Sequence, residues 1–308
     1  MSKIPFLYNA ELGKNSWWRY IVTIVATWGI QGIVGILVAV LFVVFLIMQN
    51  GISAVGLNIQ SIQSNSLFLV ALALIGFTAS YFVFYLCTRF IHKRLFISLF
   101  TTKSRINWGR MLKGAVLWFL ILGMLTLIFY LINPASYELT FNPSTFGMLL
   151  ILSLITFPIQ ASFEEVFFRG YLMQGVGLLS KKPIVPLLAT SFLFGIGHIM
   201  NGTGMTLSVF PLIETVIIGI ALGIITLGED GIETAIGIHV MNNLYAVLIV
   251  STPDGIFGNL PSIMMTSSSP SGDILTTAAA AVIAVVIIFW NKKDKLRDIF
   301  RWEDAEPN

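Results

Sequence analysis

The stretch FPIQASFEEVFFRGYLMQG, residues 157–175, places three ionisable side chains in a run of otherwise mostly apolar and small residues. These are Glu164, Glu165 and Arg169. A charged side chain at the centre of a bilayer costs at least ~2.5–3.5 kcal/mol on insertion scales. If the chain lies in a membrane, the three residues therefore mark a candidate functional site facing the interior of a helix bundle.

The composition supports the membrane assignment. Of 308 residues, 56% are hydrophobic and 11% are charged, and the mean hydropathy is +0.87. A soluble domain carries about 25% charged residues. We therefore predict an all-α, polytopic membrane helix bundle in which residues 1–308 form a single integral membrane domain. The expected partners are the lipid bilayer and a peptide or protein substrate, and no nucleic acid.

The apolar runs predict about eight transmembrane helices, because roughly 20 apolar residues are needed to cross a bilayer. The predicted spans are residues 20–48, 68–88, 114–132, 146–176, 184–200, 208–228, 232–251 and 274–290. The first and fourth are long enough to tilt or to project beyond the bilayer.

The Lys and Arg residues predict the orientation, because cytoplasmic loops are enriched in both. With the N-terminus inside, the predicted inner segments are 1–19, 89–113, 177–183, 229–231 and 291–308, and every Lys and Arg except Arg169 falls within them. The predicted outer segments 49–67, 133–145, 201–207 and 252–273 contain none. We expect a multi-pass protein of the plasma (inner) membrane with both termini cytoplasmic.

Residues 89–110 mix basic residues with Phe, Ile, Leu and Trp. This mixture is typical of a segment that lies along the membrane interface, where basic side chains meet anionic headgroups. We predict that the segment lies on the cytoplasmic interface and that His92 within it is a surface residue.

Helical spacing separates the roles of the two glutamates. Glu165 and Arg169 are four residues apart and therefore share a helix face, so they are predicted to form an ion pair. Glu164 is rotated by about 100° from its neighbour and is left as the candidate general base. In the alternative, all three residues form an ion-pair staple between helices.

Two further stretches carry intramembrane histidines. FLFGIGHIMN contains His198, and GIHVMNNLYA contains His239 with Asn242 and Asn243 three and four residues further on. An imidazole and a carboxamide together offer donors to a developing negative oxygen. No serine or cysteine lies at a recognisable nucleophile elbow, which favours water as the nucleophile of a hydrolytic site.

The predicted depths of the two histidines differ. Counted from the cytoplasmic end of each predicted span, His239 lies about seven residues in, or ~10 Å, and His198 about fourteen residues in, or ~21 Å. We expect them to meet only if the fifth span begins below the membrane surface or tilts strongly.

The chain resembles the CAAX prenyl protease and bacteriocin-processing (CPBP, or Abi) family over residues 145–250. It does so in three motifs that occur in the family's order, Glu164-Glu165-x-x-x-Arg169, Phe194-x-x-x-His198 and His239-x-x-x-Asn243. Eukaryotic members of this family remove the last three residues after a prenylated cysteine. Bacterial relatives are associated with bacteriocin maturation or self-immunity.

The resemblance implies an intramembrane glutamate-type endopeptidase without a cofactor, whose catalytic helices are residues 145–250. Its substrate would be a peptide or protein, with its lipidation left open. By motif position, the resemblance implies these roles: Glu164 and His198 in water activation, His239 and Asn243 in the oxyanion hole, and Glu165 and Arg169 in support.

Three alternatives stay open at this point. Glu164, His198 and His239 could hold a catalytic zinc ion, since three protein ligands plus water are a common arrangement. The protein could also be a non-catalytic membrane scaffold or self-immunity protein. A transporter is disfavoured because no inverted repeat is visible. Glu214, outside the motifs, is expected either to form a packing hydrogen bond or to support the site.

Overall fold

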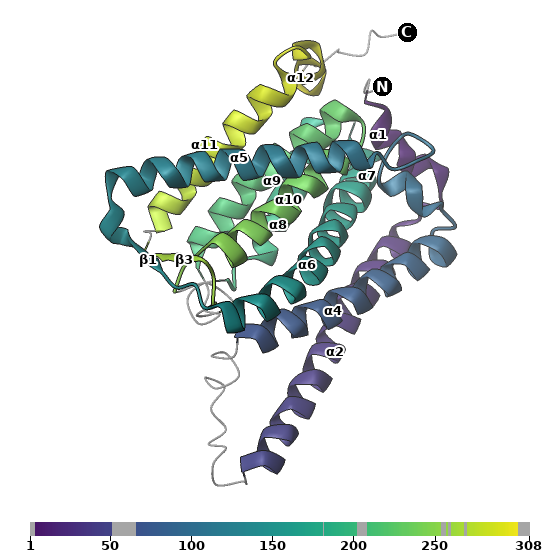
Figure 1. Ribbon diagram of the computed structural model, residues 1–308. Coiled ribbons are helices and arrows are strands. Elements are labelled where there is room, and N and C mark those ends of the chain that lie inside the picture. The colour runs from purple at the N-terminus through teal and green to yellow at the C-terminus, as the bar shows by residue number, and fades with distance from the viewer. Residues whose placement is uncertain are drawn as a thin grey trace, which may run out of the picture.

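A computed structural model describes residues 4–50, 66–180, 182–201, 208–253, 257, 260–267 and 270–300. Within these ranges the chain forms a bundle of long helices, and α1 and α12 lie at the same end of it (Figure 1). Lys3, Lys181 and Arg301, together with most of the predicted outer segments 49–67 and 201–207, lie outside the described residues.

Each of the eight predicted spans coincides with helix. The segments are α2 (Trp17–Asn50), α4 (Ser66–Leu86), α5 (Trp108–Ile132), α6 (Pro143–Glu165) continued by the π-helical η5 (Val166–Leu172) and α7 (Met173–Gly177), α8 (Ile184–Gly197), α9 (Val209–Glu229), α10 (Glu233–Leu244) continued by the π-helical η7 (Tyr245–Ile249), and α11 (Pro270–Phe289).

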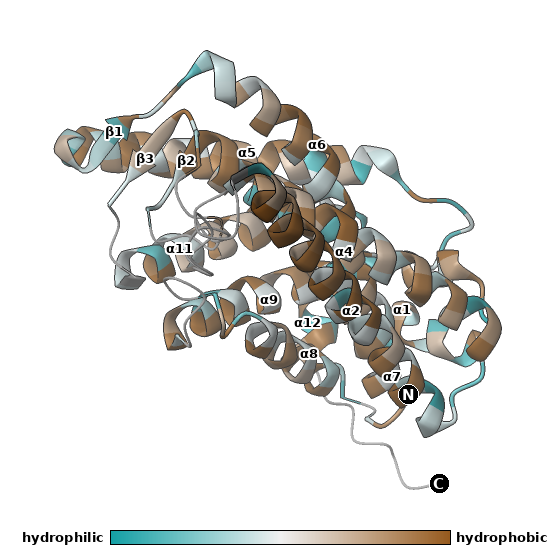
Figure 2. Ribbon diagram, turned by 90° about the horizontal axis from the view of Figure 1, so that it is seen from below, coloured by the Kyte–Doolittle hydropathy of each residue, from teal (hydrophilic) through white to brown (hydrophobic). Residues whose placement is uncertain are grey.

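The all-α membrane fold is confirmed, and its long helices are apolar along most of their length (Figure 2). Six of the segments are long and apolar enough to cross a membrane. By contrast, α8 has 14 residues and α10 has 12. The count of eight crossings therefore stays a prediction.

The remaining elements are short and lie at the two ends of the bundle. They are α1 (Pro5–Tyr8), η1 (Asn9–Leu12), η2 (Cys87–Ile91), η3 (Phe96–Leu99), η4 (Pro134–Ser136), β1 (Tyr137–Leu139), β2 (Val250–Ser251), β3 (Met264–Thr266) and α12 (Lys293–Phe300). The strands form a small sheet in the order β1-β3-β2, with β1 antiparallel and β2 parallel to β3. This sheet was not predicted from the sequence, and it lies at the end opposite α1 and α12 (Figure 1).

Helix α10 is the central element although it is short. All residues from Glu233 to His239 are buried, because α5, α6 and α9 pack around the helix. A Cβ atom added to Gly237 would lie 1.9 Å from the carbonyl oxygen of Met111 on α5. The absence of a side chain therefore lets the two backbones touch, which holds α10 in register with the bundle.

The segment after α4 is partly buried: Phe90, Leu95 and Trp108 are exposed, whereas other side chains point into the bundle. His92 is 2% exposed and Arg94 is 3% exposed. The His92 ring contacts the carbonyl oxygen of Lys14 at 2.9 Å through Nδ1 and the hydroxyl of Tyr171 at 2.8 Å through Nε2, and Arg94 donates to the side chain of Gln174. The prediction of a surface histidine is wrong, because these partners satisfy its polar atoms inside the protein.

The turn between α9 and α10 packs against the segment that follows α4. The Ile232 amide donates to the carbonyl oxygen of Phe100 at 2.8 Å, and a Cβ atom on Gly170 would lie 2.4 Å from the carbonyl oxygen of Leu99. The structure nevertheless brings His198 and His239 to the wall of one cavity, so the difference in their predicted depths does not keep them apart.

Candidate active site

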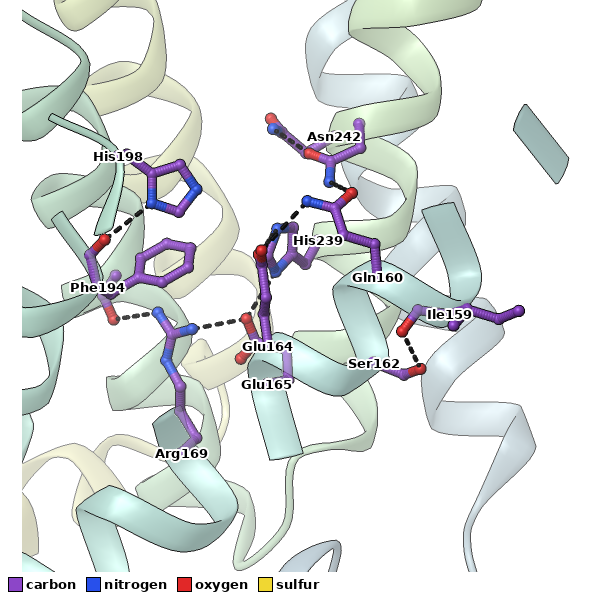
Figure 3. A network of polar contacts seen from close by, with 12 residues as sticks. Ile159, Gln160, Ser162, Glu164, Glu165, Arg169, Phe194, His198, His239 and Asn242 are labelled. Atoms are coloured by element: carbon purple, nitrogen blue, oxygen red, sulfur yellow. Dashed lines mark hydrogen bonds and ion pairs between the residues drawn. The ribbon is translucent and has the colours of Figure 1, made fainter. Parts of the chain in front are cut away.

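The motif residues come together from consecutive parts of the bundle (Figure 3). Glu164 and Glu165 end α6, and Arg169 lies in the π-helical η5 that follows. His239 and Asn243 lie on α10. Single-turn π-helical segments inside α-helices occur frequently at functional sites. Here the π-helical turn begins directly after the two glutamates.

Glu165 is the buried counter-ion of the site. Its Oε1 atom accepts hydrogen bonds from Arg169 Nη1 at 2.7 Å and from His239 at 2.7 Å, and the side chains of Glu165 and Arg169 are 0% exposed. The predicted pair of these two residues is confirmed. Arg169 also donates to the carbonyl oxygen of Gly219 at 3.2 Å, and its guanidinium carbon lies 4.5 Å from the ring centroid of Phe194. Its buried Nε atom has no hydrogen-bond partner among the described residues.

Glu164 faces a different environment from its neighbour. It lines a cavity of about 520 Å³, whereas Glu165 does not. Its Oε1 atom accepts a hydrogen bond from Gln160 at 3.2 Å, and its Oε2 atom lies 3.4 Å from His239 Nε2. The carboxylate that needs no arginine is therefore the one placed to meet a molecule in the cavity.

His239 bridges the two glutamates. Its Nδ1 atom lies 2.7 Å from Glu165 Oε1 and its Nε2 atom 3.4 Å from Glu164 Oε2. Because Glu165 is held by Arg169 as an acceptor, we assign a proton to Nδ1, which fixes the ring and directs Nε2 towards Glu164 and the cavity. His239 also lines the cavity.

The polar chain continues away from the glutamates. Asn243 donates to Gln160 at 3.1 Å, Asn242 donates to Asn243 at 3.3 Å, and Trp118 of α5 donates to Asn242 at 3.1 Å. Gln160 was not identified from the sequence. The sequence does indicate it, because Gln160 precedes Glu164 by four residues in an apolar span and so lies on the same helix face.

His198 lies at the C-terminal cap of α8, where the helix ends. Its Nδ1 atom is 2.8 Å from the carbonyl oxygen of Phe194, and the two rings lie 4.5 Å apart. His198 lines the same cavity as Glu164, and among the described residues no hydrogen bond or ion pair joins the two. His239 is thus the histidine in contact with Glu164, and His198 faces Glu164 from the opposite side of the cavity (Figure 3).

Glu214 lies apart from this network. Thr277 of α11 donates a hydrogen bond to its Oε1 atom at 2.8 Å, and Glu214 does not line the cavity of Glu164. Of the two expectations for this residue, the structure shows the packing hydrogen bond, which joins α9 to α11.

A zinc site would require several ligands that converge on one point. In the described part of the chain, no group of three or more His, Cys, Asp and Glu side chains is arranged to hold a metal ion. Zinc therefore stays an alternative that metal analysis has to test.

Comparison with known proteins connects this geometry to a family. The family model described as Type II CAAX prenyl endopeptidase Rce1-like matches residues 143–245. The protein named "Uncharacterized protein YyaK" of Bacillus subtilis (strain 168) is 31% identical over 260 residues, which are 84% of this chain and 86% of YyaK. No solved structure gives a significant match. The matched residues contain all three motifs and the helices that position them, and the chain belongs to the Rce1-like family of Type II CAAX prenyl endopeptidases.

Proposed function

We propose that the protein is an intramembrane endopeptidase in which Glu164 activates water to hydrolyse a peptide bond. Family membership supports a CAAX protease-like membrane endopeptidase in general. The observation that carries the glutamate mechanism is the contrast between two adjacent carboxylates. Glu165 is sealed between Arg169 and His239, whereas Glu164 lines the cavity.

The proposed reaction uses the atoms that face the cavity. Glu164 accepts a proton from water, and the resulting hydroxide adds to the carbonyl carbon of the scissile amide. Asn243 Nδ2 donates to the oxygen that becomes negative. His239 also donates to it from Nε2 in its doubly protonated form, while its Nδ1–H is held by Glu165. When the C–N bond breaks, the proton held by Glu164 passes to the leaving amine, and the products are a carboxylic acid and an amine. His198 assists by holding the water from the opposite wall.

The distribution of charged residues indicates the orientation of the protein in its membrane. The predicted inner segments contain nearly all Lys and Arg residues, which supports cytoplasmic termini in a plasma membrane protein. We also infer that residues 1–308 act as one integral membrane domain. The substrate is a peptide or protein that reaches the site within the bilayer, and its lipidation is a matter for experiment.

Comparative proteomics of membrane peptides tests the proposal. Membranes from cells with the wild-type protein are compared with membranes from cells with Glu164→Gln. Glu214→Gln is the matched control, because it makes the same chemical change in a partly buried carboxylate outside the cavity. We expect cleaved peptides with wild type and Glu214→Gln and none with Glu164→Gln. Equal peptide profiles in all three would instead favour a non-catalytic scaffold.

A further inference from the structure

The cavity has a wall that the family motifs do not supply. Besides the motif helices, it is lined by α2 and α4, which precede the family-matched residues 143–245. Gln31 lies on this wall, near the middle of the apolar helix α2. A carboxamide in such a helix is costly unless it has a hydrogen-bond partner.

Gln31 has no such partner within the parts of the chain that the structure describes. Its Oε1 atom is buried and accepts no hydrogen bond there. Its Cγ atom lies 3.4 Å from where a Cβ atom of Gly76 on α4 would be, so the side chain extends over a glycine of the neighbouring helix. Buried polar atoms in proteins are nearly always hydrogen-bonded, and exceptions call for an explanation.

A second unpartnered polar atom lines the same cavity. Ser251 of β2 is 3% exposed, and its buried Oγ atom has no hydrogen-bond partner among the described residues. It lies beyond the end of α10 and η7, whereas Gln31 lies on α2. The cavity therefore offers polar groups from two separate walls, in addition to the polar network around Glu164.

The surface between these polar groups is apolar. Leu69, Leu72 and Phe77 of α4 line the cavity together with Phe168 of η5. Its volume of about 520 Å³ falls in the range of ligand sites, which are about 300–1,000 Å³ and have apolar walls with a few placed polar groups. This chemistry suits a short stretch of peptide with apolar side chains.

We propose that Gln31 anchors a substrate subsite by hydrogen-bonding the main chain of an extended apolar peptide next to the scissile bond. The inference rests on the proposed function and adds the substrate class, an apolar segment of a membrane-embedded or membrane-associated chain. A carboxamide has both donors and an acceptor, so it can pair with the main-chain N–H and C=O that such a peptide brings into the cavity. Ser251 provides a second contact of the same kind.

Peptide binding tests the subsite without relying on turnover. The probe is a short fluorescein-labelled peptide with central leucines, and its partner of equal length has central serines. Both are titrated by fluorescence anisotropy into the Glu164→Gln protein in lipid nanodiscs, with Gln31→Leu added in a second protein. Gln49→Leu is the matched control, because Gln49 is an exposed glutamine near the end of the same helix.

We expect the leucine peptide to bind more tightly than the serine peptide. Gln31→Leu should weaken its binding about 2- to 10-fold, the effect of one hydrogen bond, and Gln49→Leu should leave it unchanged. Equal binding by the Gln31→Leu and Gln49→Leu proteins, or equal binding of the two peptides, would overturn the proposal.

A pair of glycine variants tests the same cavity by volume. Gly35 of α2 lines the cavity, and a Cβ atom there would meet no atom within 4 Å. Gly32 has equally open surroundings, is exposed and does not line the cavity. Gly35→Leu should therefore weaken binding of the leucine peptide, and Gly32→Leu should not. Equal effects of the two substitutions would contradict the location of the subsite.

The subsite and the catalytic proposal can fail separately. In one outcome, binding of the leucine peptide depends on Gln31 but the wild-type protein does not cleave the peptide. This outcome supports the subsite and contradicts the proposed hydrolysis. In the other outcome, the wild-type protein cleaves the peptide, Glu164→Gln does not, and Gln31→Leu leaves binding unchanged. This outcome supports the hydrolysis and contradicts the subsite.

Discussion

The Nδ1 atom of His239 lies 2.7 Å from Oε1 of Glu165, although the two residues are 74 positions apart in the sequence. The same carboxylate oxygen accepts a hydrogen bond from Arg169. Glu165 thus joins α10 to the helix that carries both glutamates and holds a buried arginine and a histidine at once. Loss of the Glu165 carboxylate would therefore disturb the packing of these helices, whereas Glu164 lines the cavity where a substrate can reach it.

We predict that Glu165→Gln and Glu164→Gln differ in stability. Loss of the Glu165 charge leaves the fully buried Arg169 without its counter-ion, and breaking a buried pair costs about 3–5 kcal/mol. Glu165→Gln should therefore unfold at a clearly lower temperature in detergent, while Glu164→Gln should stay close to wild type. Equal unfolding temperatures for both variants would contradict the division of roles between the two glutamates.

The two histidines should respond differently to substitution. His239→Asn removes a ring that contacts both glutamates, so activity and unfolding temperature should both fall. His198→Asn removes a partly exposed ring that bonds only to its own helix end among the described contacts. It should abolish peptide cleavage with little change in unfolding temperature. A large loss of stability in His198→Asn would show that this residue supports the fold.

Close packing of α5 against α10 gives a test of the fold itself. A Cβ atom at Gly237 would overlap the carbonyl oxygen of Met111 at 1.9 Å, whereas a Cβ atom at Gly123 of α5 would meet nothing within 4 Å. Gly237→Ala should destabilise the protein by at least about 1–3 kcal/mol through overpacking. Gly123→Ala should be neutral or stabilising. Thermal unfolding of the two variants measures the difference, and a tolerated Gly237→Ala would refute the close contact between the two backbones.

Stability should depend on pH through His92. Burial lowers the pKa of this histidine from its ordinary value of 6.5, so the folded protein favours the neutral ring. As the pH falls below 6.5, His92 becomes protonated in the unfolded chain before it does so in the folded protein. The free energy of unfolding therefore decreases until the pH reaches the lower pKa of His92 in the folded protein. The unfolding temperature should therefore drop between about pH 7.5 and about pH 5.5. The drop should be smaller in His92→Gln, and an equal drop in both proteins would contradict this assignment.

Removal of metal ions should leave cleavage intact. In the proposed mechanism a carboxylate activates the water, so no metal ion has to polarise it. We expect no stoichiometric zinc in purified protein by elemental analysis, and peptide cleavage should survive a strong chelator. Cleavage that is lost on chelation and restored by added zinc would favour the metal-dependent alternative.

Features that depend on local spacing were predictable from the sequence. The apolar runs indicated where helices lie, because an uninterrupted run of about 20 apolar residues has few other stable states in a bilayer. The Glu165–Arg169 ion pair followed from the four-residue spacing within one helix. In the same way, Gln160 stands four residues before Glu164 and could have been found by the same rule.

Features that depend on contacts between helices were decided only by the tertiary structure. These include the position of His239 between the two glutamates, the carboxamide oxygen of Gln31 that has no hydrogen-bond partner among the described residues, and the burial of His92. Helical periodicity determines which residues share a face of one helix. It does not determine which helix that face meets or at what depth, because those depend on how the side chains of distant segments pack together.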